Sequence, residues 1–249
     1  MRPFNISKVH MITYGNEKFV KSKRRIFNEA INTGWFDTIT LYGPEDLDED
    51  FKLKFQNILK QPRIGGYGIW RPYIIKKKLN EINDNDILIY IDAGCSINPK
   101  GKKRFKEYIA MLNKNDVGVI SFQMLYKERH WTTREIFNYF NVDIDSKLAN
   151  TGQILDTVII MKKNKNLINM NNIWFKTIYD NPLLFTDYYN KENQKLYFRD
   201  NRHEQSIFSV IRKMNNPLLL KDETNEWVRE SNKIIWSHDK PFRATRIRI

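Results

Sequence analysis

A run of five apolar residues, Ile87–Ile91, constrains the fold of this chain more than any other feature. Such a run is typical of a strand buried on both faces, and therefore of a central strand in a parallel sheet. The run ends at Asp92, and the small residues Ala93 and Gly94 follow. Because open α/β sheets bind ligands at the carboxyl ends of their strands, we expect Asp92 to meet a metal ion or a ribose hydroxyl, with a diphosphate close to the two small residues. The alternative is an aspartate that caps the next turn.

Strands and helices alternate along the first half of the chain. Apolar runs predict strands at 9–15, 38–42, 87–91 and 117–122, and helical spacing predicts helices at 17–33, 47–59, 72–82 and 100–112. The second half predicts helices at 164–180 and 203–213 and strands at 155–161 and 234–238. This alternation indicates an α/β fold with a doubly wound sheet. We expect one domain over 1–249, in which about 1–125 bind a nucleotide and about 126–249 bind the other substrate.

The chain carries 42 lysines and arginines against 29 acidic residues, a net charge of +13. This excess favours an anionic partner such as a nucleotide, a phosphorylated substrate, a nucleic acid or an anionic membrane surface, although most of these side chains are expected to be solvated. The terminal arginines Arg243, Arg246 and Arg248 form a basic cluster that could hold an acidic acceptor or a membrane surface, with a solvated terminus as the alternative. The single cysteine, Cys95, excludes an intrachain disulfide and a cysteine cluster for zinc.

No stretch of the sequence approaches the roughly 18 consecutive apolar residues of a membrane span. Residues 1–8 lead into no apolar stretch like that of a secretory signal. We therefore expect a soluble, cytoplasmic protein whose contact with a membrane, if there is one, is peripheral.

An aromatic, glycine-rich segment, RIGGYGIWRP at 63–72, precedes the third predicted helix. Glycine lets the backbone approach a ligand closely, Tyr67 or Trp70 can stack on a base or a sugar, and Arg71 can pair with phosphate. The alternative is a tight turn with core aromatics. Because Pro72 follows directly, the segment differs from dinucleotide and Walker loops, which argues against NAD or ATP chemistry.

Two further segments carry candidate site residues. His238 follows an apolar run and can ligate Mn²⁺ as a neutral imidazole, and Lys240 can neutralise a leaving diphosphate. At a predicted helix start, Glu204 and Gln205 can bind sugar hydroxyls, and Glu204 can stabilise positive charge at an anomeric carbon. The alternatives are a surface histidine beside Asp239 and an acid that complements the helix dipole.

Together these segments resemble the GT-A class of nucleotide-sugar glycosyltransferases. Over most of the chain the order matches: a first strand, GYGIWRP before a helix, an apolar strand ending in YIDAGCSIN, the HEQS helix start and the C-terminal SHDKPF. YIDAGCSIN is similar to the Asp-x-Asp region of the class, HEQS to the acid–glutamine pair of its retaining members, and SHDKPF to its His…Lys-Pro element. The resemblance implies a Rossmann-like GT-A fold with a mixed, mainly parallel sheet flanked by helices.

By this resemblance, the chain moves a sugar from a nucleoside-diphosphate sugar, expected to be a UDP-sugar, to a glycan, lipid-linked or protein acceptor, with retention. The resemblance implies a divalent ion, Mn²⁺ or Mg²⁺, at Asp92 and His238, and it places Lys240 at the diphosphate. It implies that Glu204 and Gln205 contact the transferred sugar.

Further site residues follow from the resemblance alone. It implies Tyr14 and Gly15, at the end of the first strand, near the base and ribose. It implies Gln153 as a contact to the acceptor or sugar, and Asp187 as a contact to a sugar hydroxyl. If the enzyme inverts instead, Asp187 or Glu204 serves as the general base.

One departure from the class concerns the metal. The second acid of Asp-x-Asp is the principal metal ligand, and this chain has Gly94 at that position. Metal binding is then expected to be weak, to depend on His238, or to be absent. In the last case Lys240 or Arg71 stabilises the diphosphate.

Three alternatives remain open. A basic, aromatic-rich chain can bind nucleic acid by phosphate contact and stacking, but its lysines are mixed with acids and it lacks an RNA-binding signature, so no nucleic acid is expected. A nucleotidyltransferase would need a glycine-rich phosphate loop after the first strand, which 13–17 lacks. The third alternative, which Gly94 supports, is a catalytically inactive glycosyltransferase-like protein.

Overall fold

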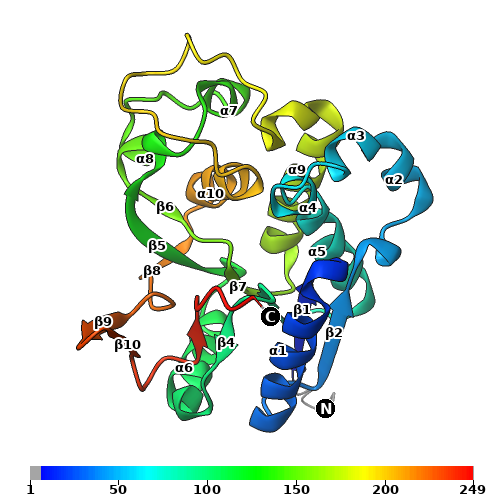
Figure 1. Ribbon diagram of the computed structural model, residues 1–249, viewed down its shortest axis with the longest axis vertical. Coiled ribbons are helices and arrows are strands. Elements are labelled where there is room, and N and C mark those ends of the chain that lie inside the picture. The colour runs from blue at the N-terminus through cyan, green and yellow to red at the C-terminus, as the bar shows by residue number, and fades with distance from the viewer. Residues whose placement is uncertain (1–6, 249) are drawn as a thin grey trace.

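The computed structural model describes residues 7–248, and its centre is a seven-stranded sheet in the order β2-β1-β3-β7-β5-β6, with β8 paired to β5 (Figure 1). The strands of this sheet are β1 (Val9–Tyr14), β2 (Thr38–Tyr42), β3 (Ile87–Ile91), β5 (Val119–Lys127), β6 (Gly152–Ile154), β7 (Val158–Lys162) and β8 (Leu218–Lys221). Two small antiparallel sheets pair β4 (Ser96–Ile97) with β11 (Phe242–Arg243) and β9 (Trp227–Glu230) with β10 (Lys233–Trp236).

The directions of the strands make the large sheet mixed. Strand β1 runs parallel to β2 and β3, and β5 runs parallel to β8. Strand β7 lies antiparallel between β3 and β5, and β6 is antiparallel to β5. Strands β2, β1, β3, β5 and β8 therefore point one way, and β7 and β6 point the other way. The predicted α/β fold with a mixed, mainly parallel sheet flanked by helices is confirmed.

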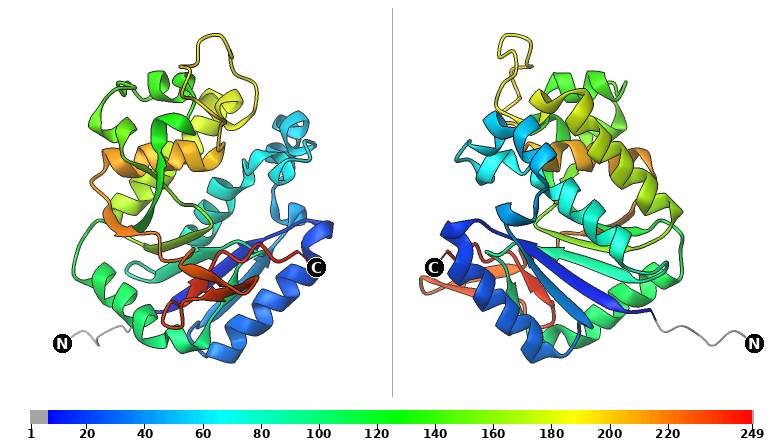
Figure 2. Two further views of the ribbon diagram at one scale, coloured as in Figure 1. Left: turned by 60° about the vertical axis from the view of Figure 1, so that its left-hand side comes forward. Right: turned by 90° about the vertical axis from the view of Figure 1, so that its right-hand side faces the viewer.

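Helices cover both faces of the sheet (Figure 2). They are α1 (Val20–Thr33), α2 (Glu49–Lys54), α3 (Gln56–Leu59), α4 (Ile64–Tyr67), α5 (Trp70–Glu81), α6 (Lys102–Asn113), α7 (Arg134–Tyr139), α8 (Lys147–Asn150), α9 (Lys165–Asp180) and α10 (Glu204–Met214). Alternate side chains of β3 enter different layers. Leu88 and Tyr90 pack in the cluster that contains residues of α5, α9 and α10, whereas Ile87, Ile89 and Ile91 pack in the cluster that contains residues of α1 and α6. The whole strand is buried for this reason.

Where the predicted elements differ from the structure, the differences are local. The predicted helix at 17–33 begins with a 3₁₀ turn at Glu17–Phe19, and Gly34 ends it with a φ of 63° and an N–H bond to the Ile31 carbonyl. The predicted helix at 47–59 is divided at Phe55, whose φ and ψ are −110° and 19°. The predicted last strand at 234–238 forms β10 of the small hairpin with β9 and does not join the large sheet.

Among residues 7–248, no helix combines the length and the apolar content that a membrane crossing needs. The expectation that residues 1–8 are not a secretory signal concerns a segment of which 1–6 lie outside the described residues.

Candidate active site

Asp92 lies at the carboxyl end of β3, where the chain leaves the sheet. Its backbone N–H donates to the Thr157 carbonyl at 2.9 Å, which holds the turn against the start of β7. One carboxylate oxygen, Oδ1, accepts hydrogen bonds from the Tyr90 hydroxyl at 2.5 Å and from Arg71 Nη2 at 2.9 Å. The side chain is 35% exposed, and Oδ2 has no donor among residues 7–248, so this oxygen is open to a ligand.

Arg71 is buried between two acids. It lies in the first turn of α5, where Nη2 reaches Asp92 and Nη1 forms an ion pair with Glu204 at the start of α10. Glu204 is 3% exposed, and burial raises its pKa to about 7 although the charge of Arg71 opposes the shift. A chain of carboxylate, guanidinium and carboxylate therefore runs from the interior to the surface and directs Arg71 toward Asp92.

The glycine-rich segment before α5 includes the short element α4, whose backbone is a left-handed turn and not a regular right-handed helix. Its residues with positive φ, between 53° and 88°, are Ile64, Gly65, Gly66, Tyr67 and Gly68. The Trp70 indole N–H donates to the Ile64 carbonyl at 3.2 Å and closes this turn. A Cβ at Gly68 would lie 2.5 Å from the carboxyl carbon of Glu204. The close approach that glycine allows is therefore made here by an acid of the protein itself.

The first predicted aromatic contacts lie in the core. Tyr14 and Trp70 are both buried and stack on each other with ring centroids 3.8 Å apart. Gly15 is also buried, and its N–H donates to the Tyr42 carbonyl at 3.2 Å. Tyr14, Gly15 and Trp70, which the resemblance and the sequence predict at the donor, are each covered by other parts of the protein in this structure. Tyr67 is half-buried beside His203, with ring centroids 4.8 Å apart, and keeps a partly open ring.

Asp187 belongs to a second charged cluster, at the start of α10. Its carboxylate accepts from Arg63 Nη1 at 3.0 Å and lies 2.8 Å from His203 Nε2, and Arg63 also pairs with Asp200 at 2.5 Å. Burial alone raises the pKa of Asp187, but the bonds from His203 and Arg63 bring it below its usual value. Burial lowers the pKa of His203, which favours a neutral imidazole. Asp187 is therefore an ionised, firmly held carboxylate.

The side-chain amide of Gln205 is hydrogen-bonded to residues at the edge of the sheet. Its Oε1 accepts from the Asp156 N–H at 3.2 Å, and its Nε2 donates to Gln153 Oε1 at 2.7 Å. Gln153 is fully buried and donates to Glu128 at 2.9 Å and to Thr132 at 3.1 Å. Gln153, predicted as a sugar or acceptor contact, is therefore buried and bonded to Gln205 in this structure. Gln205 itself is half-buried and remains within reach of a ligand.

Asp156 is not among the predicted site residues, yet it lies at this edge of the sheet, just before β7. It is 1% exposed and forms an ion pair with Arg212 of α10. Burial raises its pKa to about 6 although Arg212 opposes the shift, and the nearby charge of Asp92 adds to it. The available signal was an acid directly after the apolar pair Ile154 and Leu155, at the start of a predicted core strand.

The C-terminal candidates are engaged elsewhere. His238 is exposed in the loop between β10 and β11, and its carbonyl accepts from Asn98 Nδ2 at 3.0 Å. The Lys240 ammonium lies 3.1 Å from Asp239 and 3.5 Å from Glu223. Lys240, predicted to meet the diphosphate, therefore belongs to a cluster of ion pairs with Glu223 and Asp239.

The donor set at Asp92 does not fit a divalent cation. Its carboxylate is shared with the buried guanidinium of Arg71, which would repel a cation bound there. Gly94 offers no side-chain oxygen. Among residues 7–248, no group of three or more histidine, cysteine, aspartate or glutamate side chains is placed to hold a metal ion. The predicted Mn²⁺ or Mg²⁺ site at Asp92 and His238 is therefore not formed by these residues.

Backbone contacts fix the turn after Asp92 from two directions. Arg25 of α1 donates to the carbonyls of Ala93 and Cys95 at 2.9 and 2.6 Å. The carbonyl of Gly94 accepts from Thr245 Oγ1 at 3.0 Å and from the Ile247 N–H at 2.9 Å. These bonds hold the backbone of the turn in place, with α1 on one side and the C-terminal segment on the other.

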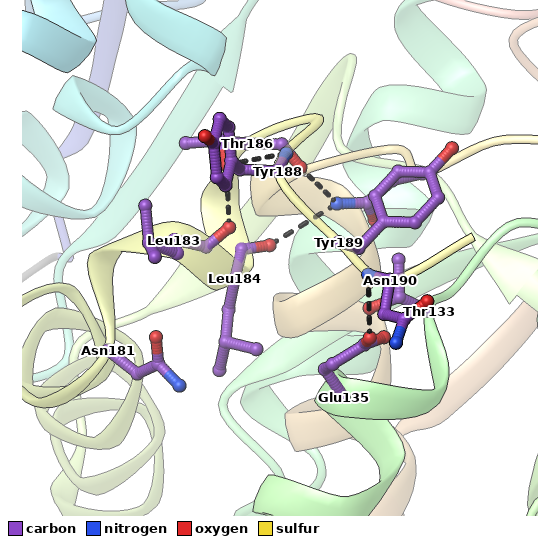
Figure 3. A pocket seen from close by; sticks show the side chains of 10 residues that line it. Thr133, Glu135, Asn181, Leu183, Leu184, Thr186, Tyr188, Tyr189 and Asn190 are labelled. Carbon is purple, nitrogen blue, oxygen red and sulfur yellow. Dashed lines mark hydrogen bonds between the residues drawn. The ribbon is translucent and has the colours of Figure 1, made fainter. Parts of the chain in front are cut away.

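A hollow of about 400 Å³ lies under the segment 186–190 (Figure 3). Two leucines, Leu183 and Leu184, line it together with amide, hydroxyl and phenol groups, among them those of Asn181, Thr186, Tyr188, Tyr189 and Asn190. Asp187 lies between two of these lining residues and turns its carboxylate to Arg63 and His203. The segment therefore joins the hollow to the charged cluster at the start of α10.

No protein-family profile and no curated protein matches this sequence. Similar solved structures include a glycosyltransferase involved in glycosylation of the major capsid of PBCV-1, which is 12% identical with a TM-score of 0.38 over 70% of this chain and 69% of that chain. Mouse xyloside xylosyltransferase 1 in its apo form is 10% identical, with a TM-score of 0.45 over 86% of this chain and 84% of that chain. The galactosyltransferase LgtC with donor and acceptor sugar analogues is 10% identical, with a TM-score of 0.42 over 81% of this chain and 70% of that chain. Identities this low do not transfer the role of any residue to this chain.

Proposed function

We propose that this protein is a glycosyltransferase that moves a sugar from a nucleoside-diphosphate sugar, with a UDP-sugar as the expected donor, to a glycan, lipid-linked or protein acceptor. The acid at the end of the central strand carries the proposal, because Asp92 presents one oxygen to solvent while Arg71 and Tyr90 hold the other. An acid at this edge of an α/β sheet is well placed to bind the hydroxyls of a nucleotide donor. The confirmed fold class supplies the frame for such a site.

Departure of the diphosphate is the step in which negative charge develops. A guanidinium that is already fixed stabilises this charge without reorganising, and two acids fix the direction of Arg71. Glu204, predicted to contact the sugar, is buried and paired with Arg71. We therefore assign Glu204 to positioning Arg71, and we assign contact with the sugar to Gln205 and Asp187.

We propose that transfer retains the anomeric configuration. An inverting enzyme needs a general base at the acceptor hydroxyl, and the sequence predicts Asp187 or Glu204 for this role. Glu204 is buried and paired with Arg71, which leaves Asp187 as the more accessible candidate. The bonds from Arg63 and His203 lower the pKa of Asp187, which makes it a weak base. Proton NMR of the first product reads the anomeric centre directly. We expect the configuration of the donor, and an inverted centre would rule retention out.

Donor use is tested by incubating the protein with UDP-sugars and GDP-sugars and measuring release of the nucleoside diphosphate. Asp92→Asn is expected to lower kcat/KM about 100-fold or more. Asp84→Asn makes the same chemical change on a side chain that is 81% exposed, just before the opposite end of β3, and serves as the matched control. Binding of a nucleoside diphosphate without turnover of any donor would favour the inactive alternative. Failure of every nucleoside diphosphate to bind would refute the proposal.

The alternative of a nucleic-acid-binding module is not favoured. Three acids, Asp92, Asp156 and Glu204, act electrostatically on Arg71 at the centre of the site. Carboxylates gathered there oppose a polyphosphate backbone, whose binding depends on basic side chains. An affinity for oligonucleotides that exceeds the affinity for UDP and falls steeply with salt would reverse this preference.

We expect the acceptor to enter the hollow of Figure 3. Phenol and amide groups suit the faces and hydroxyls of a sugar, and Asp187 lies at the border of the hollow. Tyr189→Ala should raise KM for the acceptor and leave KM for the donor unchanged. An unchanged acceptor KM would place the acceptor elsewhere.

A further inference from the structure

A distant part of the chain covers the position at which the GT-A pattern has its second acid. Thr245 and Ile247 both donate to the Gly94 carbonyl, at 3.0 and 2.9 Å. A Cβ placed on Gly94 would lie 3.6 Å from the Cα of Arg246. Arg246 therefore lies over the place where the chain lacks a carboxylate.

The segment that carries Arg246 is firmly attached. Strand β11 pairs with β4, and the buried ring of Phe242 packs edge-on against Phe105 with centroids 6.2 Å apart. The Ala244 N–H donates to the Thr224 carbonyl at 2.9 Å. Arg246 itself has a φ of 56°, a left-handed conformation that residues with a side chain seldom adopt. The contacts on both sides hold this conformation against its strain and keep the arginine exposed over the turn.

Arg246 and Arg202 are two exposed cations that form no salt bridge within the part of the chain that the structure describes. Arg202 packs over the Trp131 ring, 4.1 Å from its centroid. Burial lowers the pKa of Arg202, Asp200 opposes this shift, and the charges of Arg63 and Arg246 add to it. The positive charge of Arg246 therefore acts on Arg202. An anion between two such groups would relieve the repulsion.

Positive charge near Asp92 and Gly94 disfavours a bound cation and favours a bound anion. The guanidinium group of Arg71 lies beside Asp92, and the backbone of Arg246 lies over Gly94 and carries its positive side chain there. A divalent ion there would have one shared carboxylate as its side-chain ligand and positive neighbours on two sides. A diphosphate would instead meet donors whose planar geometry matches its oxygens.

We propose that Arg246, together with Arg202, holds the diphosphate of the donor in the place that a divalent ion would otherwise take, so that donor binding is independent of metal. This inference rests on the proposed function, because it assumes that the donor is a nucleoside-diphosphate sugar. It assigns a binding role to the terminal arginine that the sequence predicts to be solvated. It also assigns to Arg246 the task that the sequence gives to Lys240, whose ammonium is occupied by Glu223 and Asp239.

Calorimetric titration of the full chain tests the inference, with UDP as the probe and uridine as the probe that lacks phosphate. We expect the same affinity for UDP in EDTA as in Mn²⁺. Arg246→Ala should weaken UDP binding about tenfold or more and leave uridine binding unchanged, since the lost bonds are to a charged group. Arg246→Lys, which keeps the charge but not the planar fork, should give an intermediate affinity. Arg202→Ala should weaken UDP in the same direction.

Arg229→Ala is the matched control, because it removes one arginine from the exposed strand β9 and changes the net charge equally. Thermal unfolding of each variant shows that it is folded. UDP binding that EDTA abolishes and Mn²⁺ restores would overturn the inference while supporting the proposed function. An Arg246→Ala variant that binds UDP as tightly as Arg229→Ala would also overturn it. If UDP, GDP and ADP all fail to bind, the proposed function fails, and the inference fails with it.

Discussion

Two buried arginines, Arg71 and Arg212, form ion pairs of two kinds. In a closed pair the acid is buried, and in an open pair the acid is partly exposed to solvent. Arg212 of α10 pairs with Asp156, which is 1% exposed. Arg71 pairs with the equally hidden Glu204, but its second acid, Asp92, is 35% exposed. Helix α10 contributes one residue to each pair: Glu204 to the pair with Arg71, and Arg212 to the pair with Asp156.

The two pairs are expected to serve different purposes, one the stability of the fold and the other the reaction. A closed pair cannot reach a ligand, and removing one partner leaves a buried charge that nothing compensates. In the open pair, Arg71 orients Asp92, whose carboxylate water or a ligand can reach. We expect the Arg212 pair to matter for folding and the Arg71 pair to matter for donor binding and transfer. Four measurements test this contrast.

The largest effect is expected for Arg212→Met. The change leaves Asp156 without its partner in the interior and should cost about 3–5 kcal/mol of unfolding free energy, measured from urea denaturation. The double variant Arg212→Met/Asp156→Leu removes both charges and should recover most of that loss. If the double variant is as unstable as the single one, the ion pair is not the cause.

If the proposed function is right, Arg71→Met should lower kcat/KM for transfer about 100-fold, because the fixed guanidinium beside Asp92 is lost. Its cost in stability should be smaller than that of Arg212→Met. Asp92 is partly exposed and can be hydrated, and the raised pKa of Glu204 lets that acid take up a proton. Kinetics and urea denaturation of the same preparation measure both effects. A variant that loses stability as Arg212→Met does while keeping its activity would reverse the contrast.

Glu204→Gln should change how stability depends on pH. Folding raises the pKa of Glu204 from 4.5 to about 7, so between these values the folded protein holds a proton that the unfolded chain releases. Stability contributed by this group is therefore present at low pH and falls as pH rises through that window. The variant should lose this part of the decline, a difference of about 2–4 °C in Tm for each kcal/mol involved. Identical pH profiles of Tm in the two proteins would contradict the raised pKa.

Tyr90→Phe is expected to have the smallest effect. It removes one of the two donors to Asp92 Oδ1 and leaves Arg71 in place, so kcat/KM should fall about fivefold. Tyr108→Phe is the matched control, because it deletes a similar bond, 2.7 Å long, from a tyrosine to Glu223 outside the site. The control should alter stability and not activity. Equal losses of activity in both variants would show that the Tyr90 effect is not local.

Local patterns in the sequence predict most of the frame. The strand at 87–91 and the strand at 38–42 occur at the predicted bounds, because the burial of alternate or consecutive residues leaves a short-range signal. Gly34 ends α1 as predicted, since a left-handed cap favours glycine. The predicted strand at 234–238 did not join the large sheet, because an apolar run of four or five residues does not specify its partner strand.

The candidate site was predictable only in part. The sequence marks Asp92 as an acid after an apolar strand, Arg71 as a charge in the glycine-rich segment and Glu204 as an acid at a predicted helix start. The structure brings these three side chains together. The roles of Tyr14, Trp70 and Gln153 depend on which neighbours cover them, and no spacing in the sequence reports that.

Residues that are neighbours along the chain are enough to predict the strand that ends in Asp92 and the alternation of strands and helices, and they show directly that Gly94 offers no acid. Only the tertiary structure decided which charges meet. Arg71 and Glu204 are 133 residues apart, and Gly94 and Thr245 are 151 residues apart. Such contacts arise from the packing of α10 and of the C-terminal segment against the sheet edge, a product of the whole core that no local pattern encodes.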